Sequence, residues 1–199
     1  MRTPQNESYP VPPPGYQTAI PFQYPKIKLQ IAAVGLLVIT TPALIVITWL
    51  LQGRPASFTF ILDGFLELVL VLVVVVATIV LHELVHGLTY QLLGYRVTYG
   101  VSIHLLAAYA GAFKQWQKRN HNILVALAPL VGLTPWLLWL LSLPQPIVVL
   151  LAFAALLFNI GGAVGDIYLA WRLLRLPRDT LLYDIDASTM LIFIPSCSQ

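Results

Sequence analysis

The sequence predicts an all-α membrane protein, a bundle of four transmembrane helices with a short extended or β segment between the second and third. Of its 199 residues, 58% are hydrophobic and only 10% are charged. The mean hydropathy of +0.81 is far above that of soluble globular domains. Four apolar stretches are each long enough to cross about 30 Å of hydrocarbon. They cover residues 31–51, 66–93, 123–143 and 147–171.

The charges that flank these stretches predict the orientation of the bundle. With the N-terminus inside, ten of the eleven basic residues lie on the cytoplasmic side and only Arg54 lies outside. We therefore expect a multi-pass protein of the cell membrane with both termini cytoplasmic. The net charge of +3 follows from this asymmetry. It predicts contact with the lipid bilayer and its anionic head groups, not with nucleic acid.

Composition also divides the chain into three parts. Residues 1–28 are polar and rich in proline, which predicts a disordered cytoplasmic tail. Residues 29–172 hold the four apolar stretches, and residues 173–199 form a cytoplasmic C-terminal tail. Between the second and third stretches, residues 97–103 alternate apolar with small or polar side chains, the period of a strand.

The most informative motif is His82-Glu83-Leu84-Val85-His86, at the end of an apolar run without ionisable groups. On a helix, His82 and His86 lie one turn apart on one face, so both rings can reach a single metal ion. Glu83 lies about 100° around the helix, close enough to a water on that metal without being a ligand. This is the H-E-x-x-H arrangement of zinc peptidases, with Glu83 as the general base. The alternative is that the helix has already left the bilayer and these side chains are merely solvated.

A catalytic zinc site normally takes three protein ligands, so a third ligand is needed. Asp166 is the only acid in the fourth apolar stretch. Counted from the outer ends of their helices, Glu83 lies at a depth of about 26 Å and Asp166 at about 29 Å. This similar depth favours Asp166. A pairing of Asp166 with Arg172 is the alternative, and His104 is a second candidate ligand.

Asn159 lies seven residues before Asp166, two helical turns away on the same face. It is a candidate for hydrogen bonding to the substrate or to a developing oxyanion, and an interhelical hydrogen bond without a catalytic role is the alternative. Gly161 and Gly165 form a small-xxx-small pair, which allows another helix to approach closely.

Together these motifs resemble the site-2-protease-type intramembrane zinc metalloproteases, whose helices carry H-E-x-x-H and whose later helix donates an Asp. The chain resembles the membrane zincin peptidase family still more closely. The similarity covers about residues 60–175 and includes HELVHG, an Ala128-Pro129 helix and a helix with Asn159, Gly165 and Asp166. It implies one Zn²⁺ in a four-helix transmembrane metallopeptidase domain, with Glu83 as catalytic base and three ligands: His82, His86 and Asp166.

We therefore expect an intramembrane zinc metalloprotease that hydrolyses peptide bonds of a membrane-associated protein or peptide near the cytoplasmic leaflet. One alternative is a non-catalytic metal-binding membrane protein that acts through partner binding. Another is a membrane di-iron enzyme, because the two histidines also match one histidine box of that class. Such enzymes need many more histidines than the four in this chain.

Overall fold

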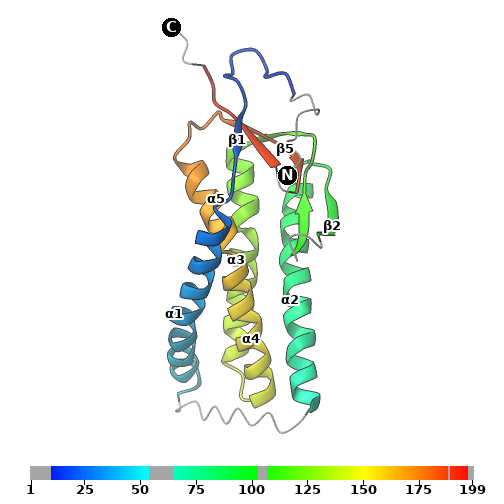
Figure 1. The fold of residues 1–199 in the computed structure, drawn as a ribbon. Helices are drawn as coiled ribbons and strands as arrows, with labels where there is room; N and C mark the ends of the chain where they lie inside the picture. The colour runs from blue at the N-terminus through cyan, green and yellow to red at the C-terminus, as the bar shows by residue number, and fades with distance from the viewer. Residues whose placement is uncertain (1–9, 54–64, 103–106, 188, 197–199) are drawn as a thin grey trace.

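The protein is a long helical bundle that carries two small sheets at one end (Figure 1). The computed structural model describes residues 10–53, 65–102, 107–187 and 189–196. Its helices are α1 (Lys26–Gln52), α2 (Phe65–Leu92), α3 (Arg119–Leu141), α4 (Pro146–Gly162) and α5 (Val164–Leu174).

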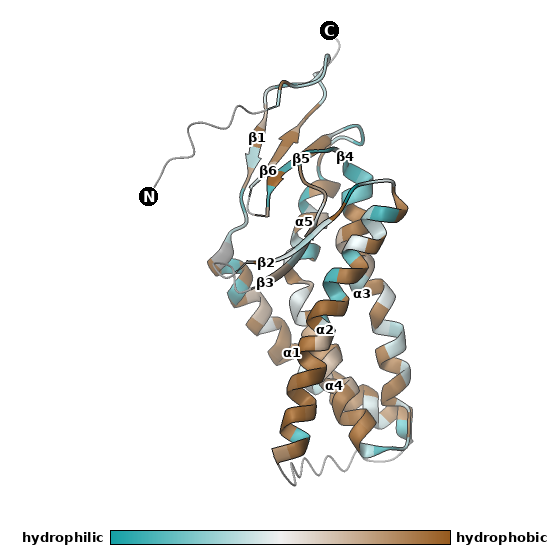
Figure 2. Cartoon of the chain, turned by 90° about the vertical axis from the view of Figure 1, so that its right-hand side faces the viewer, coloured by the Kyte–Doolittle hydropathy of each residue, from teal (hydrophilic) through white to brown (hydrophobic). Residues whose placement is uncertain are grey.

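Within the described residues, four helical stretches are long and apolar enough to cross a membrane. This confirms the number and approximate positions of the predicted apolar helices. In Figure 2, hydrophobic residues dominate α2 and α4, whereas hydrophilic residues are more frequent at the end that carries the sheets. Gly53 and Gly94 follow α1 and α2 with positive φ angles of 64° and 86°. Glycine adopts this left-handed conformation at little cost, which explains why both helices end there.

The fourth apolar stretch differs from the continuous helix that its sequence predicted. It breaks at Ala163, whose φ of −71° and ψ of −2° end α4 and start α5. Two glycines, Gly161 and Gly162, precede the break and weaken the helix. Asp166 then falls in the first turn of α5, where the helix dipole favours a carboxylate. The break therefore places Asp166 at the start of a helix of its own.

The predicted extended segment is a hairpin. Strand β2 (Thr98–Ser102) pairs antiparallel with β3 (Ala107–Gly111). Residue 103, the last of the predicted extended segment, lies outside the described residues. The strand prediction is thus confirmed for residues 98–102. The pairing strand, β3, was not predicted.

A second, four-stranded sheet was not predicted and shows that the fold is mostly helical, not all-α. Its order is β1-β6-β5-β4, and all of its neighbouring strands are antiparallel. The strands are β1 (Ile20–Phe22), β4 (Trp116–Lys118), β5 (Leu181–Asp186) and β6 (Thr189–Phe193). β1 lies inside the segment predicted to be disordered, of which residues 1–9 lie outside the described part. Its order depends on pairing with β6, a distant partner that local composition does not reveal.

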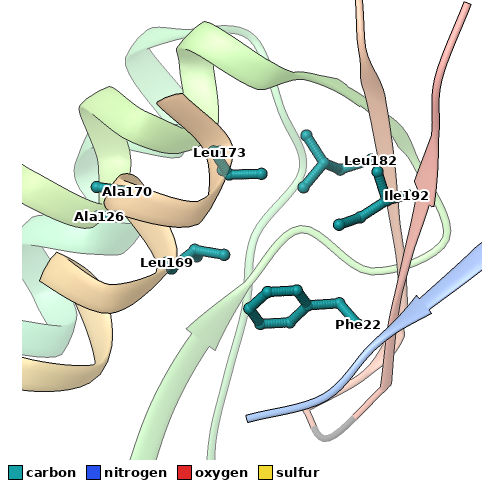
Figure 3. Close-up of a cluster of buried hydrophobic side chains, with 7 residues drawn as sticks. All are labelled: Phe22, Ala126, Leu169, Ala170, Leu173, Leu182 and Ile192. Atoms are coloured by element: carbon teal, nitrogen blue, oxygen red, sulfur yellow. The ribbon is translucent and has the colours of Figure 1, made fainter. Parts of the chain in front are cut away.

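One apolar cluster attaches this sheet to the helices (Figure 3). Side chains from three strands meet side chains from α3 and α5, and all are at least nine-tenths buried. The cluster consists of Phe22, Ala126, Leu169, Ala170, Leu173, Leu182 and Ile192. The sheet therefore packs against the ends of the helices that lie beside Asp166.

Candidate metal centre

Three potential metal ligands converge between α2 and α5. His82 and His86 are both buried on α2, with ring centroids 4.9 Å apart. The Oδ2 atom of Asp166 lies 3.1 Å from Nε2 of His82 and 3.4 Å from Nε2 of His86. One potential ligand atom from each of the three residues lies within 4.8 Å of the other two. The structure thus brings together the three residues that the sequence singled out.

The other ring nitrogen of each histidine contacts a carbonyl oxygen. Nδ1 of His82 lies 3.0 Å from Oδ1 of Asn159, and Nδ1 of His86 lies 2.8 Å from the backbone oxygen of Val125. These oxygens can only accept, so each Nδ1 carries the proton and donates it. Each Nε2 is then left with a lone pair that faces Asp166. This is the tautomer that metal-ligating histidines require.

Pro129 explains why a backbone carbonyl is available to His86. In a regular helix the oxygen of Val125 would accept the N–H of residue 129. Proline has no N–H, so this carbonyl has no such helical donor. Pro129 is buried within α3, and the Val125 oxygen accepts from His86 instead. The proline seen in the sequence therefore has a role at the site as well as in helix shape.

Asn159 is fully buried on α4 and has both of its amide atoms engaged. Its oxygen faces His82, and its Nδ2 donates to Oγ1 of Thr134 at 3.3 Å. The interhelical hydrogen bond, one of the two alternatives considered for Asn159, is present. The contact of Asn159 with a substrate or an oxyanion stays a prediction, and Asn159 does not line the cavity described below.

Glu83 points to the hairpin side of α2. Its Oε2 accepts the backbone N–H of Ala110, in β3, at 3.1 Å. The hairpin comes this close because Gly87 has no side chain. A Cβ at this position would clash with the hydroxyl of Tyr99, in β2. The last glycine of HELVHG thus lets β2 and β3 lie against the helix that carries Glu83.

A cavity of about 310 Å³ extends from these residues to the four-stranded sheet. On the helical side it is lined by Glu83, His86 and Asp166. On the opposite side it is lined by residues before α1 and from the β5–β6 hairpin, including Tyr24 and Asp184. Glu83 therefore faces a space that a small group can enter.

Other candidates from the sequence lie elsewhere or are not described. His121 is half-buried, and its Nδ1 lies 2.9 Å from the hydroxyl of Tyr95. No ion pair between Asp166 and Arg172 is present in the described part of the chain. Residue His104 lies outside the described residues. Of the glycines in α4, Gly161 faces Leu37 of α1, whereas Gly162 lies nearest to His82.

The family comparison covers this site. A family model described as "Putative zincin peptidase" matches residues 75–181, more than half of the chain. The chain belongs to this family. Comparison with curated proteins and with solved structures gives no match. All four candidate site residues of this zincin family member lie in the matched segment: His82, Glu83, His86 and Asp166.

The donor set fits the metal that the zincin family implies. Two neutral imidazoles and one carboxylate, with room for a further ligand, are typical of catalytic zinc. Both imidazoles present the correct nitrogen, and both are held by an acceptor on the far side of the ring. His82, His86 and Asp166 form a possible metal site on this basis.

Sequence analysis missed several contributors to the site. The oxygen of Val125 and the N–H of Ala110 belong to the backbone, so no side chain in the sequence identifies them. Pro129, four residues after Val125, is an indirect signal for the Val125 oxygen, because it removes the helical donor of that oxygen. Thr134 on α3 is an ordinary helix residue until Asn159 is placed beside it. Tyr24 and Asp184 reach the cavity only through the unpredicted sheet.

Proposed function

We propose that this zincin family member is an intramembrane zinc metalloprotease that hydrolyses peptide bonds of membrane-associated substrates near the cytoplasmic leaflet. The observation that carries the proposal is the convergence of three ligand atoms beside a cavity that Glu83 also lines. His82, His86 and Asp166 would hold the ion. When bound, zinc acidifies a water and polarises a carbonyl.

Glu83 supplies the base in this proposal. Its Oε2 accepts the Ala110 N–H, which leaves the other carboxylate oxygen free to take a proton from the attacking water. The same carboxylate then returns the proton to the leaving amine. A purely structural metal site usually has four closed protein ligands and needs no such carboxylate. This argues against a non-catalytic protein that acts through partner binding.

The hairpin offers an edge to an extended substrate. Because the N–H of Ala110 is directed to Glu83, this edge of β3 faces away from β2 and toward the site. A peptide that adds to the same edge would place its carbonyls beside the candidate metal site. In a membrane, the four apolar helices would set the depth of the site, and the basic residues would place it at the cytoplasmic side.

The first test measures zinc in the full chain purified in mild detergent. Elemental analysis is expected to give about one zinc per wild-type chain, a loss in Asp166→Ala and no loss in His121→Ala, a histidine outside the cluster. Retention of zinc by Asp166→Ala would contradict the ligand assignment.

The second test concerns catalysis. Glu83→Gln preserves the size of the side chain and is expected to retain zinc, but to lower peptide hydrolysis by about 10²- to 10⁴-fold. A Glu83→Gln protein with wild-type hydrolysis would exclude the base assignment. A wild-type protein that holds zinc but hydrolyses no peptide would favour the partner-binding alternative.

A further inference from the structure

The cavity has a second acidic region in its lining, on the side of the β5–β6 hairpin. There the lining includes Asp184 and Asp186, together with Tyr24 and Met190. These four residues lie outside the segment matched by the family model, which ends at residue 181. The helical side of the cavity, with Glu83, His86 and Asp166, therefore lies within the family match. The opposite side comes from parts of the chain outside that match.

Asp184 is a buried carboxylate that forms no ion pair with any described residue. Its residue is only 7% exposed. Its Oδ2 accepts a hydrogen bond from Nε2 of Gln117 at 2.9 Å, and its Oδ1 has no hydrogen-bond partner among the described residues. Lys114 donates its backbone N–H to the Asp184 carbonyl, but its exposed side chain forms no ion pair with the carboxylate. Burying an unpaired carboxylate in this way is costly.

Burial also changes the acidity of Asp184. Burial raises the pKa of Asp184 to about 6; the Gln117 hydrogen bond opposes this rise and the nearby charge of Asp186 adds to it. Burial, and then the charges of Asp166 and Asp184, also raise the pKa of the Tyr24 phenol. Tyr24 is thus within electrostatic reach of both acidic regions of the cavity lining. A pKa of about 6 still leaves Asp184 mainly ionised at neutral pH.

The rest of the lining is suited to an aliphatic stem. Phe113, Leu169 and Met190 contribute apolar surface, and the described lining residues include no Lys or Arg. A bound Zn²⁺ would offset the charges of Glu83 and Asp166, which leaves that of Asp184 unbalanced among the described lining residues. A chain with an apolar stem and a cationic head matches this lining, because its methylenes contact the apolar wall while its head meets the acids.

We infer that the Asp184 region of the cavity is a specificity subsite for a cationic group of the substrate, an ammonium or guanidinium held by Asp184 and Asp186. The inference rests on the proposed peptidase function and names a substrate class for it. The cationic group has two possible sources, a Lys or Arg side chain or a free α-amine. The size of the cavity, about 310 Å³, suits one such group with its adjoining backbone.

A binding experiment tests the subsite without requiring turnover. Zinc-loaded, full-length Glu83→Gln protein is screened in detergent with a positional-scanning library of octapeptides that are blocked at both ends. The best arginine-containing peptide is then compared with its citrulline analogue, which has the same shape and no charge. A third peptide carries citrulline and a free α-amine, to separate the two sources of charge.

We expect a positive charge, on the side chain or on the α-amine, to tighten binding by about tenfold or more. Asp184→Asn, which keeps an acceptor for Gln117, is expected to remove this preference, so that the arginine peptide and its citrulline analogue bind equally. Asp179→Asn removes an exposed carboxylate outside the cavity and is expected to preserve the preference. If Asp184→Asn does not fold, the more exposed Asp186→Asn provides the same comparison with a smaller expected loss.

The inference is overturned if no peptide binds, if charged and uncharged peptides bind equally, or if the preference survives the loss of either carboxylate. Hydrolysis by the wild-type protein is measured with the same peptides. Hydrolysis without any charge preference would support the peptidase and reject the subsite. A charge preference that depends on Asp184, without hydrolysis, would support the subsite and reject the peptidase.

Discussion

The two walls of the cavity are built in different ways. The helical wall presents Glu83, His86 and Asp166 from two helices, and its key contacts are polar and short. The sheet wall comes from strands that are far apart in the sequence, and an apolar cluster holds it in place. The comparison predicts that the two walls can be altered separately: changes in the helical wall should alter metal binding, whereas changes in the sheet wall should alter stability and selectivity.

The largest expected effect on the sheet wall comes from Phe22→Ala. Phe22 is only 6% exposed and lies in the cluster that joins β1 to α5. Its loss should lower the free energy of unfolding by about 3 kcal/mol, because it leaves a cavity in a packed cluster. Thermal unfolding in detergent measures the loss, and zinc content should not change. Ile20→Ala, in the same strand but 44% exposed, is the control and should cost much less. A loss of zinc in Phe22→Ala would show that the two walls are not separable.

At the candidate metal site, Asn159→Ala should give the opposite result, a loss of zinc affinity and not a large loss of stability. Without the amide oxygen, Nδ1 of His82 loses its acceptor and the ring loses its orientation. Zinc affinity should fall by about 10- to 100-fold, the usual effect of removing such a partner. Competition with a chelator measures it. Thr134→Val removes only the more distant hydrogen bond, at 3.3 Å, and should cause a smaller loss. Equal zinc affinity in Asn159→Ala and wild type would remove the positioning role.

The sheet wall should also show a characteristic dependence on pH. Burial raises the pKa of Asp184 from 3.8 to about 6 in the folded protein. The folded state therefore binds a proton more tightly than the unfolded state, so the contribution of Asp184 to stability is present below pH 4 and is lost as the pH rises through 6. The loss is at most about 3 kcal/mol.

Asp184→Asn should remove this loss, so that the variant gains stability relative to wild type between pH 4 and pH 7. Melting temperatures measured across this range give the difference, and Asp179→Asn serves as an exposed control. A difference in melting temperature that does not change with pH would show that burial does not raise the pKa of Asp184.

The smallest expected effect is that of Pro129→Ala. The substitution restores an N–H that competes with His86 for the oxygen of Val125. A carbonyl has two lone pairs, so the His86 contact should weaken without disappearing. We expect zinc affinity to fall by no more than about tenfold. Pro135→Ala, in the same helix and six residues further on, is the matched control. An equal effect of the two substitutions would point to helix shape instead of the freed carbonyl.

The sequence predicted the helical wall much better than the sheet wall, for a physical reason. His82, Glu83 and His86 are linked by local helical periodicity, and Asp166 stands out because a lone acid in an apolar helix is expensive. β1 has no such local signal: three residues after a proline-rich segment become a strand only because β6 supplies their hydrogen bonds. The break at Ala163 was likewise hidden within an apolar run. Asp184 could not be assigned to the cavity without the register of β5 and β4.

The pairing of Ile20 with Ile192 determines when the four-stranded sheet can form during synthesis of the chain. A ribosome adds about 5–20 residues per second, so β1 must wait on the order of ten to thirty seconds before its partner strand has been made. During that interval α2, with both histidines and Glu83, is already complete. The nascent chain therefore contains His82, Glu83 and His86 before the strand that completes the sheet on the other side of the cavity has been made.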